Sequence, residues 1–270
     1  GTYTELEYPG QEEKQLREAF VNFGDLSRFP VYLSVGKKTI NFGNFQSYNP
    51  TTHTVSNHFY RADSSDIVAE LGYMDNNSRI AFTAMKGGRQ LRVADTPDNN
   101  YLENFAISGQ HRFDIDKNTN ISVGGGYLYS TIYDSDSANH PGQAPDPLTV
   151  RKRNGAYDAW IEAKHNNLSF MAEYTKTERD WPATGAPVEA LTLQAAYDAQ
   201  FWGKDTRFSA VYGRGKQGND GDQFETLHQA ILGGEMFITP NFSLSAEYVY
   251  NRGFVPLIMI SRASDKDVDT

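Results

Sequence analysis

Apolar and polar residues alternate with a period of two along most of this chain. The clearest segments are residues 66–73, 157–164, 168–175, 191–200 and 242–251. In each of them alanine, leucine, isoleucine, phenylalanine or tyrosine occupies most positions of one face, while mainly acidic, amide and hydroxyl residues occupy the other. Successive side chains of a strand point to opposite faces, so these segments predict strands with one apolar and one polar wall. The i, i+3, i+4 spacing of an amphipathic helix does not persist over any long stretch.

The connections between these segments alternate between short and long. Short segments with Asn, Asp, Gly or Pro lie near 24–29, 75–78, 114–119, 165–167, 202–205 and 237–240. Longer polar stretches lie at about 41–64, 89–99, 132–153, 178–187, 215–224 and 253–266. Short turns at one end and long loops at the other are typical of outer-membrane barrels. The pattern therefore predicts a transmembrane antiparallel up-and-down β-barrel with long outward loops. It would have about 12 strands of ~10 residues each, and residues 2–8 are a candidate for one more.

We interpret residues 1–270 as a single barrel domain. The chain ends in Lys266-Asp-Val-Asp-Thr270, without the terminal aromatic strand that outer-membrane proteins normally carry, so we expect a closing strand to be missing. Aromatic residues near the predicted strand ends, such as Tyr73, Tyr127 and Tyr250, suggest interfacial girdles. The alternative is a soluble sheet protein, in which Tyr and Phe are also common. Apolar faces made of Ala, Gly and Tyr favour the membrane.

Composition narrows the function classes. The chain has 34 Asp+Glu against 25 Lys+Arg, a net charge of −9 and a pI near 5.2. A nucleic-acid partner would call for a basic face, so we expect none. The absence of cysteine excludes a disulfide scaffold and thiolate metal sites. The longest apolar run, Phe254 to Ile260, is far shorter than the ~20 residues of a membrane-spanning helix.

Several segments carry the strand and turn patterns of a known family. They are residues 18–37 (EAFVNFGDLSRFPVYLSVGK), 41–45 (NFGNF), 124–129 (GGGYLY) followed by 134–137 (DSDS), 170–174 (FMAEY) and 244–250 (LSAEYVY). With these segments the chain resembles the LbtU-like siderophore porins, roughly over residues 15–252. Asn41 departs from the family, in which a proline often precedes this Phe-Gly pair. The resemblance implies an outer-membrane barrel of about 14 to 16 strands when complete. It also implies uptake of ferric siderophores without TonB, and it transfers no ligand residue.

The polar wall holds the candidate functional residues. Carboxylates with a few cations among them would line a lumen that favours cations and neutral polar solutes over small anions. The alternative is a structural ion-pair network that plugs the barrel. The candidates are Glu18, Asp66, Glu70, Asp158, Glu162, Lys164, Glu173, Asp198, Arg207, Glu235 and Glu247, with Asn22 and Gln194 on the same wall.

Other candidates are weaker. Arg151, Lys152 and Arg153 are a candidate site for an anionic ferric complex or for lipopolysaccharide phosphates, against a plain solvated basic run. Asp134, Asp136 and Asp146 match no calcium-loop spacing, and the six histidines are scattered, so we expect no metal site and no cofactor. No motif marks a nucleophile, so we expect no enzyme.

The sequence thus predicts a porin-like barrel in a bacterial outer membrane. Its expected function is passive or facilitated uptake of a polar solute. The resemblance implies that this solute is a ferric siderophore and that its uptake is TonB-independent. Its expected partners are outer-membrane lipid and lipopolysaccharide, and the oligomeric state is open. The alternative function is a non-transporting barrel that is structural or binds a partner through its loops.

Overall fold

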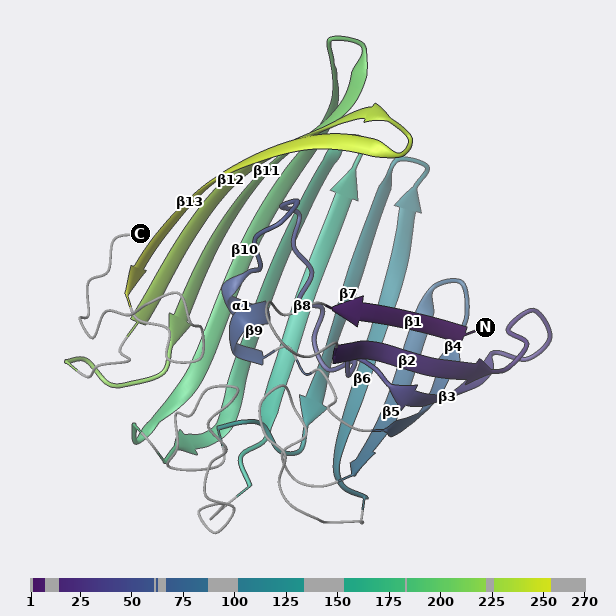
Figure 1. Cartoon of the computed structure of the whole chain (residues 1–270), viewed down its shortest axis with the longest axis vertical. Helices are drawn as coiled ribbons and strands as arrows, with labels where there is room; N and C mark the ends of the chain where they lie inside the picture. The colour runs from purple at the N-terminus through teal and green to yellow at the C-terminus, as the bar shows by residue number, and fades with distance from the viewer. Residues whose placement is uncertain are drawn as a thin grey trace.

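The computed structural model describes residues 2–7, 15–60, 62, 67–86, 102–133, 153–182, 184–221 and 226–253. These residues form one antiparallel sheet of thirteen strands, in which each strand pairs with its neighbours in the sequence (Figure 1). The strands are β1 (Thr2–Glu7), β2 (Gln15–Phe23), β3 (Val31–Lys37), β4 (Val68–Met74), β5 (Ser78–Lys86), β6 (Leu102–Asp116), β7 (Thr119–Leu128), β8 (Ala156–His165), β9 (Leu168–Trp181), β10 (Ala186–Phe201), β11 (Lys204–Lys216), β12 (Thr226–Thr239) and β13 (Phe242–Gly253). One short helix, α1 (Val55–Tyr60), lies between β3 and β4.

The predicted up-and-down topology is confirmed, and β1 shows that residues 2–8 contain a further strand. The sheet curves, but it is open within the described residues: β1 and β13 lie at its two ends and do not pair with each other (Figure 1). Residues 254–270, where the sequence suggested a missing closing strand, lie outside the described part. No described helix is long and apolar enough to cross a membrane.

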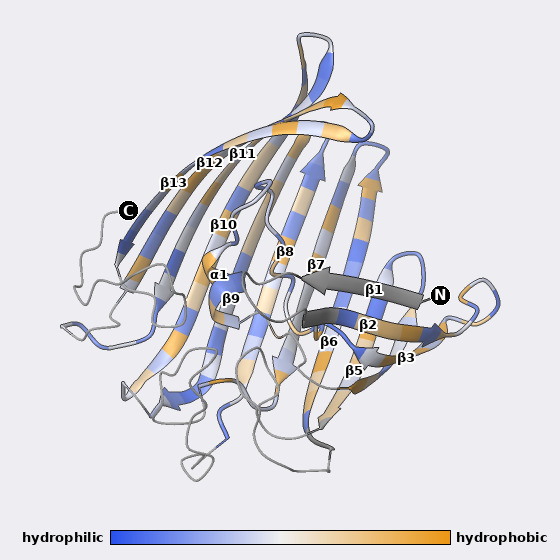
Figure 2. Ribbon diagram, viewed as in Figure 1, coloured by the Kyte–Doolittle hydropathy of each residue, from blue (hydrophilic) through white to orange (hydrophobic). Residues whose placement is uncertain are grey.

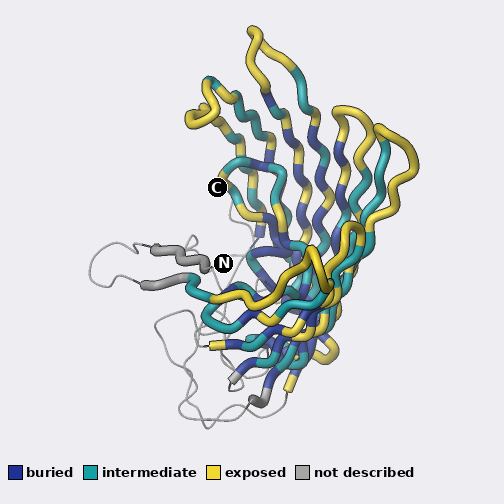
Figure 3. Tube along the Cα trace, turned by 90° about the vertical axis from the view of Figure 1, so that its right-hand side faces the viewer, coloured by how far each residue is buried: buried dark blue, intermediate teal, exposed yellow. Residues whose placement is uncertain are grey.

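The two faces of the sheet differ as the alternation predicted. On the outer, convex face, large apolar side chains are exposed, among them Leu71 (56%), Phe170 (52%) and Leu232 (60%). On the inner face, polar residues such as Glu70 (0%), Thr192 (0%) and Glu173 (1%) are buried. Figures 2 and 3 show the stripes of hydropathy and of burial along the strands. A soluble sheet would bury the apolar face, whereas a membrane barrel exposes it to lipid.

Two loop predictions were wrong. Residues 178–187 are not a long loop, because β9 runs to Trp181, β10 starts at Ala186, and the two strands pair up to that point. Residues 41–64 form a long connection, as predicted, but the described part of this connection does not extend outward. It folds back against the inner face, because apolar residues within it pack on the wall and wall carboxylates accept hydrogen bonds from its backbone.

Candidate functional site

The inner face carries a segment that we call the strap, residues 38–60. It leaves the end of β3, crosses the inner face and finishes in α1, which contacts β9, β10 and β11 (Figure 1). The start of the strap is linked to the residues that follow its end, because the backbone N–H of Ile40 donates to the carbonyl of Ala62 at 2.7 Å. The strap therefore occupies space on the inner side of the curved sheet.

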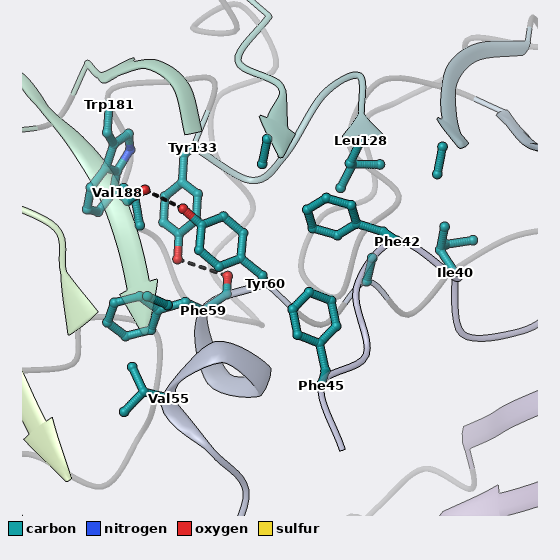
Figure 4. Packing of buried hydrophobic residues seen from close by; sticks show 14 of the residues in the cluster. Ile40, Phe42, Phe45, Val55, Phe59, Tyr60, Leu128, Tyr133, Trp181 and Val188 are labelled. Atoms are coloured by element: carbon teal, nitrogen blue, oxygen red, sulfur yellow. Dashed lines mark hydrogen bonds between the residues drawn. The ribbon is translucent and has the colours of Figure 1, made fainter. Parts of the chain in front are cut away.

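An apolar cluster attaches the strap to the wall. Phe42, Phe45, Val55, Phe59 and Tyr60 of the strap are buried against Leu128, Tyr133, Trp181 and Val188 of the wall and its loops (Figure 4). Two hydroxyls fix the orientation: Tyr60 donates to the carbonyl of Val188 at 2.5 Å, and Tyr133 donates to the carbonyl of Phe59 at 3.0 Å. Burial also raises the pKa of the Tyr60 hydroxyl, which therefore stays protonated. Buried hydroxyls with partners orient an apolar contact that would otherwise be non-directional.

Wall glycines let the strap approach the strands closely. A Cβ at Gly126 of β7 would collide with the carbonyl oxygen of Phe42, and one at Gly215 of β11 would collide with the ring of Phe59. The structure shows that Gly126 is needed for close packing of backbone on backbone.

Carboxylates at both ends of the sheet hold the backbone of the strap. At β2, Glu18 accepts a hydrogen bond from the N–H of Thr39 at 2.7 Å. At β13, Glu247 accepts hydrogen bonds from the N–H of Thr51 (2.8 Å), the N–H of Thr52 (3.1 Å) and the hydroxyls of both threonines. The strap thus reaches almost from one end of the described sheet to the other.

The middle of the strap is held by β9 and β10. Oε1 of Glu173 accepts hydrogen bonds from the N–H groups of Asn44 (2.8 Å) and Phe45 (2.9 Å). Gln194 accepts from the N–H of Tyr48 at 2.8 Å and donates to the carbonyl of Gln46 at 2.8 Å. A segment without regular structure leaves backbone groups unpaired, and these side chains supply the partners.

Glu70 of β4 is the centre of a second polar cluster. Its Oε1 accepts from Tyr32 (2.9 Å) and pairs with Lys38 (3.0 Å) and Arg79 (3.2 Å). Its Oε2 accepts from Asn41 and Thr83, both at 2.9 Å. Beside the cluster lies a cavity of about 320 Å³, lined by Phe20, Asn22, Phe23, Gly24, Leu26, Tyr32, Lys38, Glu70, Met74 and Arg79.

A third cluster of polar side chains, which we call the third group, lies on the inner face near the short turns. Tyr48 of the strap donates to Glu162 at 2.6 Å, and Lys164 pairs with the other oxygen of Glu162 at 3.2 Å. Burial and the bond to Glu162 raise the pKa of the Tyr48 hydroxyl, so it remains a donor at neutral pH. Arg207 forms a bidentate pair with Asp198 at 2.7 and 2.9 Å. Glu235 faces Arg207 across the β11–β12 pair.

The structure thus places ten of the eleven wall candidates on the inner face, and most of them contact the strap or a charged neighbour. Asp66, Arg151 and Lys152 lie outside the described residues. Arg153 is described, and its guanidinium lies 4.1 Å from the ring centroid of Tyr129, which is a cation–π contact. Among the described residues no group of three His, Cys, Asp or Glu side chains is placed to hold a metal ion.

Several residues of these clusters were not predicted from the sequence. Lys38 and Arg79 are the cations of the Glu70 cluster, and Thr51 and Thr52 are the donors to Glu247. Arg79 could have been found, because it shares one face of β5 with Thr83, while the apolar Ile80 and Phe82 occupy the other face. The strap residues carry no such signal, because they lie in an irregular segment.

The fold is that of outer-membrane porins. OccAB2 of Acinetobacter baumannii is 14% identical with a TM-score of 0.55, over 92% of this chain and 64% of OccAB2. The outer membrane channel DcaP of A. baumannii is 13% identical with a TM-score of 0.55, over 93% of this chain and 73% of DcaP. OmpF of Salmonella typhi, solved in complex with daunomycin, is 13% identical with a TM-score of 0.56, over 90% of this chain and 72% of OmpF.

These identities are low, so they establish the fold and no residue-level function. The chain spans 64% of the length of OccAB2, slightly under two thirds. No family model matches the sequence, and no curated protein matches it either. The predicted location in a bacterial outer membrane is confirmed by this fold, together with the apolar outer face. Membership of the LbtU-like siderophore porins stays a prediction.

Proposed function

We propose that this chain forms the wall of a passive outer-membrane channel for polar solutes, narrowed by the strap. The observation that carries the proposal is the strap itself, which lies on the polar inner face and is held there by wall carboxylates and by Gln194. A segment bound inside a curved wall reduces the free cross-section without closing it. Such a channel would sort solutes by size and by charge.

The charge of the inner face favours cations and neutral solutes. Glu162, Asp198 and Glu235 lie in the third group with Lys164 and Arg207, so acidic groups outnumber basic ones there. Neutralising Glu235 tests this point, because Glu235 is a partly exposed carboxylate of the inner face. We expect Glu235→Gln to lower the preference for potassium over chloride in planar bilayers. Glu178→Gln, which alters an exposed carboxylate on the opposite face of β9, should leave the preference unchanged.

For the solute we propose a ferric siderophore that enters without TonB. The support is the sequence resemblance to the LbtU-like porins in residues 15–252. The strap sets a condition on this proposal, because a bulky complex must pass the space that the strap leaves. Uptake into liposomes measures this directly, with a ferric hydroxycarboxylate siderophore compared with an uncharged sugar of equal size. Faster entry of the siderophore supports the proposal, and equal entry would leave a general diffusion channel.

A non-transporting barrel is the second candidate. The observation that favours it is the apolar cluster of the strap, which covers the inner face over β9 to β11 and acts as a partial plug. Entry of neither solute into liposomes would select this candidate. A variant without the strap separates the two cases further, because a plugged barrel should become permeable when residues 44–58 are replaced by a short glycine linker.

A further inference from the structure

Two buried carboxyl groups face each other beneath the strap. Asp158 of β8 is 6% exposed and Glu173 of β9 is 1% exposed. In the β8–β9 register, Asp158 is opposite Thr175 and Glu173 is opposite Trp160, so the two acids are diagonal neighbours on the inner face. Diagonal neighbours lie within reach of long side chains. Both carboxyl groups also lie under the same turn of the strap, because Gly43 packs against the carboxyl carbon of Asp158 and the next two residues donate to Glu173.

One oxygen of each group already has a donor. Oδ2 of Asp158 accepts from the hydroxyl of Thr175 at 2.7 Å, and Oε1 of Glu173 accepts from the N–H groups of Asn44 and Phe45. The other oxygens, Oδ1 of Asp158 and Oε2 of Glu173, are buried and have no donor among the described groups. Carboxylate oxygens only accept, so neither of these two oxygens can satisfy the other unless one of the two groups is protonated.

Within the described part of the chain, no positively charged side chain is among the neighbours of the pair. The neighbours from each packed element are Gly126 of β7, Trp160 of β8, Thr175 of β9, Thr192 of β10, and Gly43, Asn44 and Phe45 of the strap. All of these are uncharged, and the two carboxyl groups are the only titratable groups in this set. Two buried like charges at this separation cannot both be ionised without strong repulsion.

We propose that Asp158 and Glu173 form a proton-binding site, in which one shared proton lets the strap seat on the wall. The proton supplies the missing hydrogen between Oδ1 and Oε2 and leaves one negative charge on the pair. That charge is stabilised by the donors from Thr175, Asn44 and Phe45. Loss of the proton places a second negative charge under the strap, and repulsion then drives the carboxylate of Glu173 away from the strap amides.

Infrared difference spectroscopy of the folded protein in micelles tests the proton directly. At neutral pH the wild type should show a protonated-carboxyl C=O band that is absent from both Asp158→Asn and Glu173→Gln. Asp205→Asn, the same change at an exposed carboxylate, should keep the band. Absence of the band from the wild type, or its survival in both pair variants, would overturn the proposal. Heat-modifiable migration on gels verifies that each variant is folded.

Hydrogen exchange at the amides of Asn44 and Phe45 tests the link to the strap. If seating requires one proton, the opening equilibrium should rise roughly tenfold per pH unit once the proton is lost. In Asp158→Asn, which needs no shared proton, exchange corrected for its intrinsic rate should stay flat over the same range. Glu173→Gln should behave similarly, because its amide oxygen still accepts from both N–H groups. Parallel pH dependence in wild type and Asp158→Asn would refute the link.

Discussion

The contact between Glu247 and the strap gives the most direct test of how the strap is held. Glu247→Ala removes the acceptor of the N–H groups and hydroxyls of Thr51 and Thr52. A hydrogen bond to a charged group contributes about 1.5–3 kcal/mol when it is buried. Glu247 is partly exposed, so water replaces part of this interaction. We therefore expect the local opening free energy at Thr51 and Thr52, which we call the strap tip, to fall by about 2 kcal/mol in total.

Amide exchange at Thr51 and Thr52 measures that opening. A loss of about 2 kcal/mol corresponds to roughly 30-fold faster exchange at both amides. Glu247→Gln should give a smaller increase, because it keeps an acceptor oxygen and loses the charge. Ser245→Ala, on the same face of β13, serves as the control. Unchanged exchange in Glu247→Ala would refute the view that β13 anchors the strap tip.

Three further predictions concern the remaining contacts. Tyr133→Phe removes the donor to the carbonyl of Phe59, and we expect thermal unfolding in micelles to show a loss of about 1–2 kcal/mol. Gly215→Val places a side chain where the Phe59 ring lies, so proteases should cut the strap faster than in the wild type. Asp75 in the β4–β5 turn has a lowered pKa, because the N–H groups of residues 77 and 78 and the hydroxyl of residue 73 bind its carboxylate. Its contribution is present above the unfolded pKa and is lost on acidification, so Asp75→Asn should flatten the decrease in stability at acidic pH.

Much of the fold followed from the alternation of residues. The period of two placed Asp158 and Glu173 on one wall and Phe170 and Leu244 on the other, and the structure has the same arrangement. Alternation succeeds here because each strand has one face toward lipid and one toward a polar interior. It failed at residues 178–187, where polar residues such as Arg179 and Asp180 on an extended strand looked like a loop.

The site was less predictable than the wall. The sequence indicated the carboxylates but not the residues that bind them. Glu247, for example, contacts threonines that lie 195 or 196 positions earlier in the chain, and no local pattern connects such distant residues. A long polar segment between strands has the same composition whether it extends outward or folds inward. Only the pairing of its backbone with wall side chains distinguishes the two, and that pairing depends on the three-dimensional register of the strands.

The separation of these partners has a consequence for the order of assembly. The strap lies early in the sequence, whereas its tip contacts β13, the last strand of the described residues. Contacts between such distant segments carry a high loop-closure cost and form late. The strap tip can therefore dock only after β13 has joined the sheet. Until then the polar inner face stays hydrated, so insertion of β13 precedes the final narrowing of the interior, and strap docking can serve as a kinetic marker of the incorporation of β13.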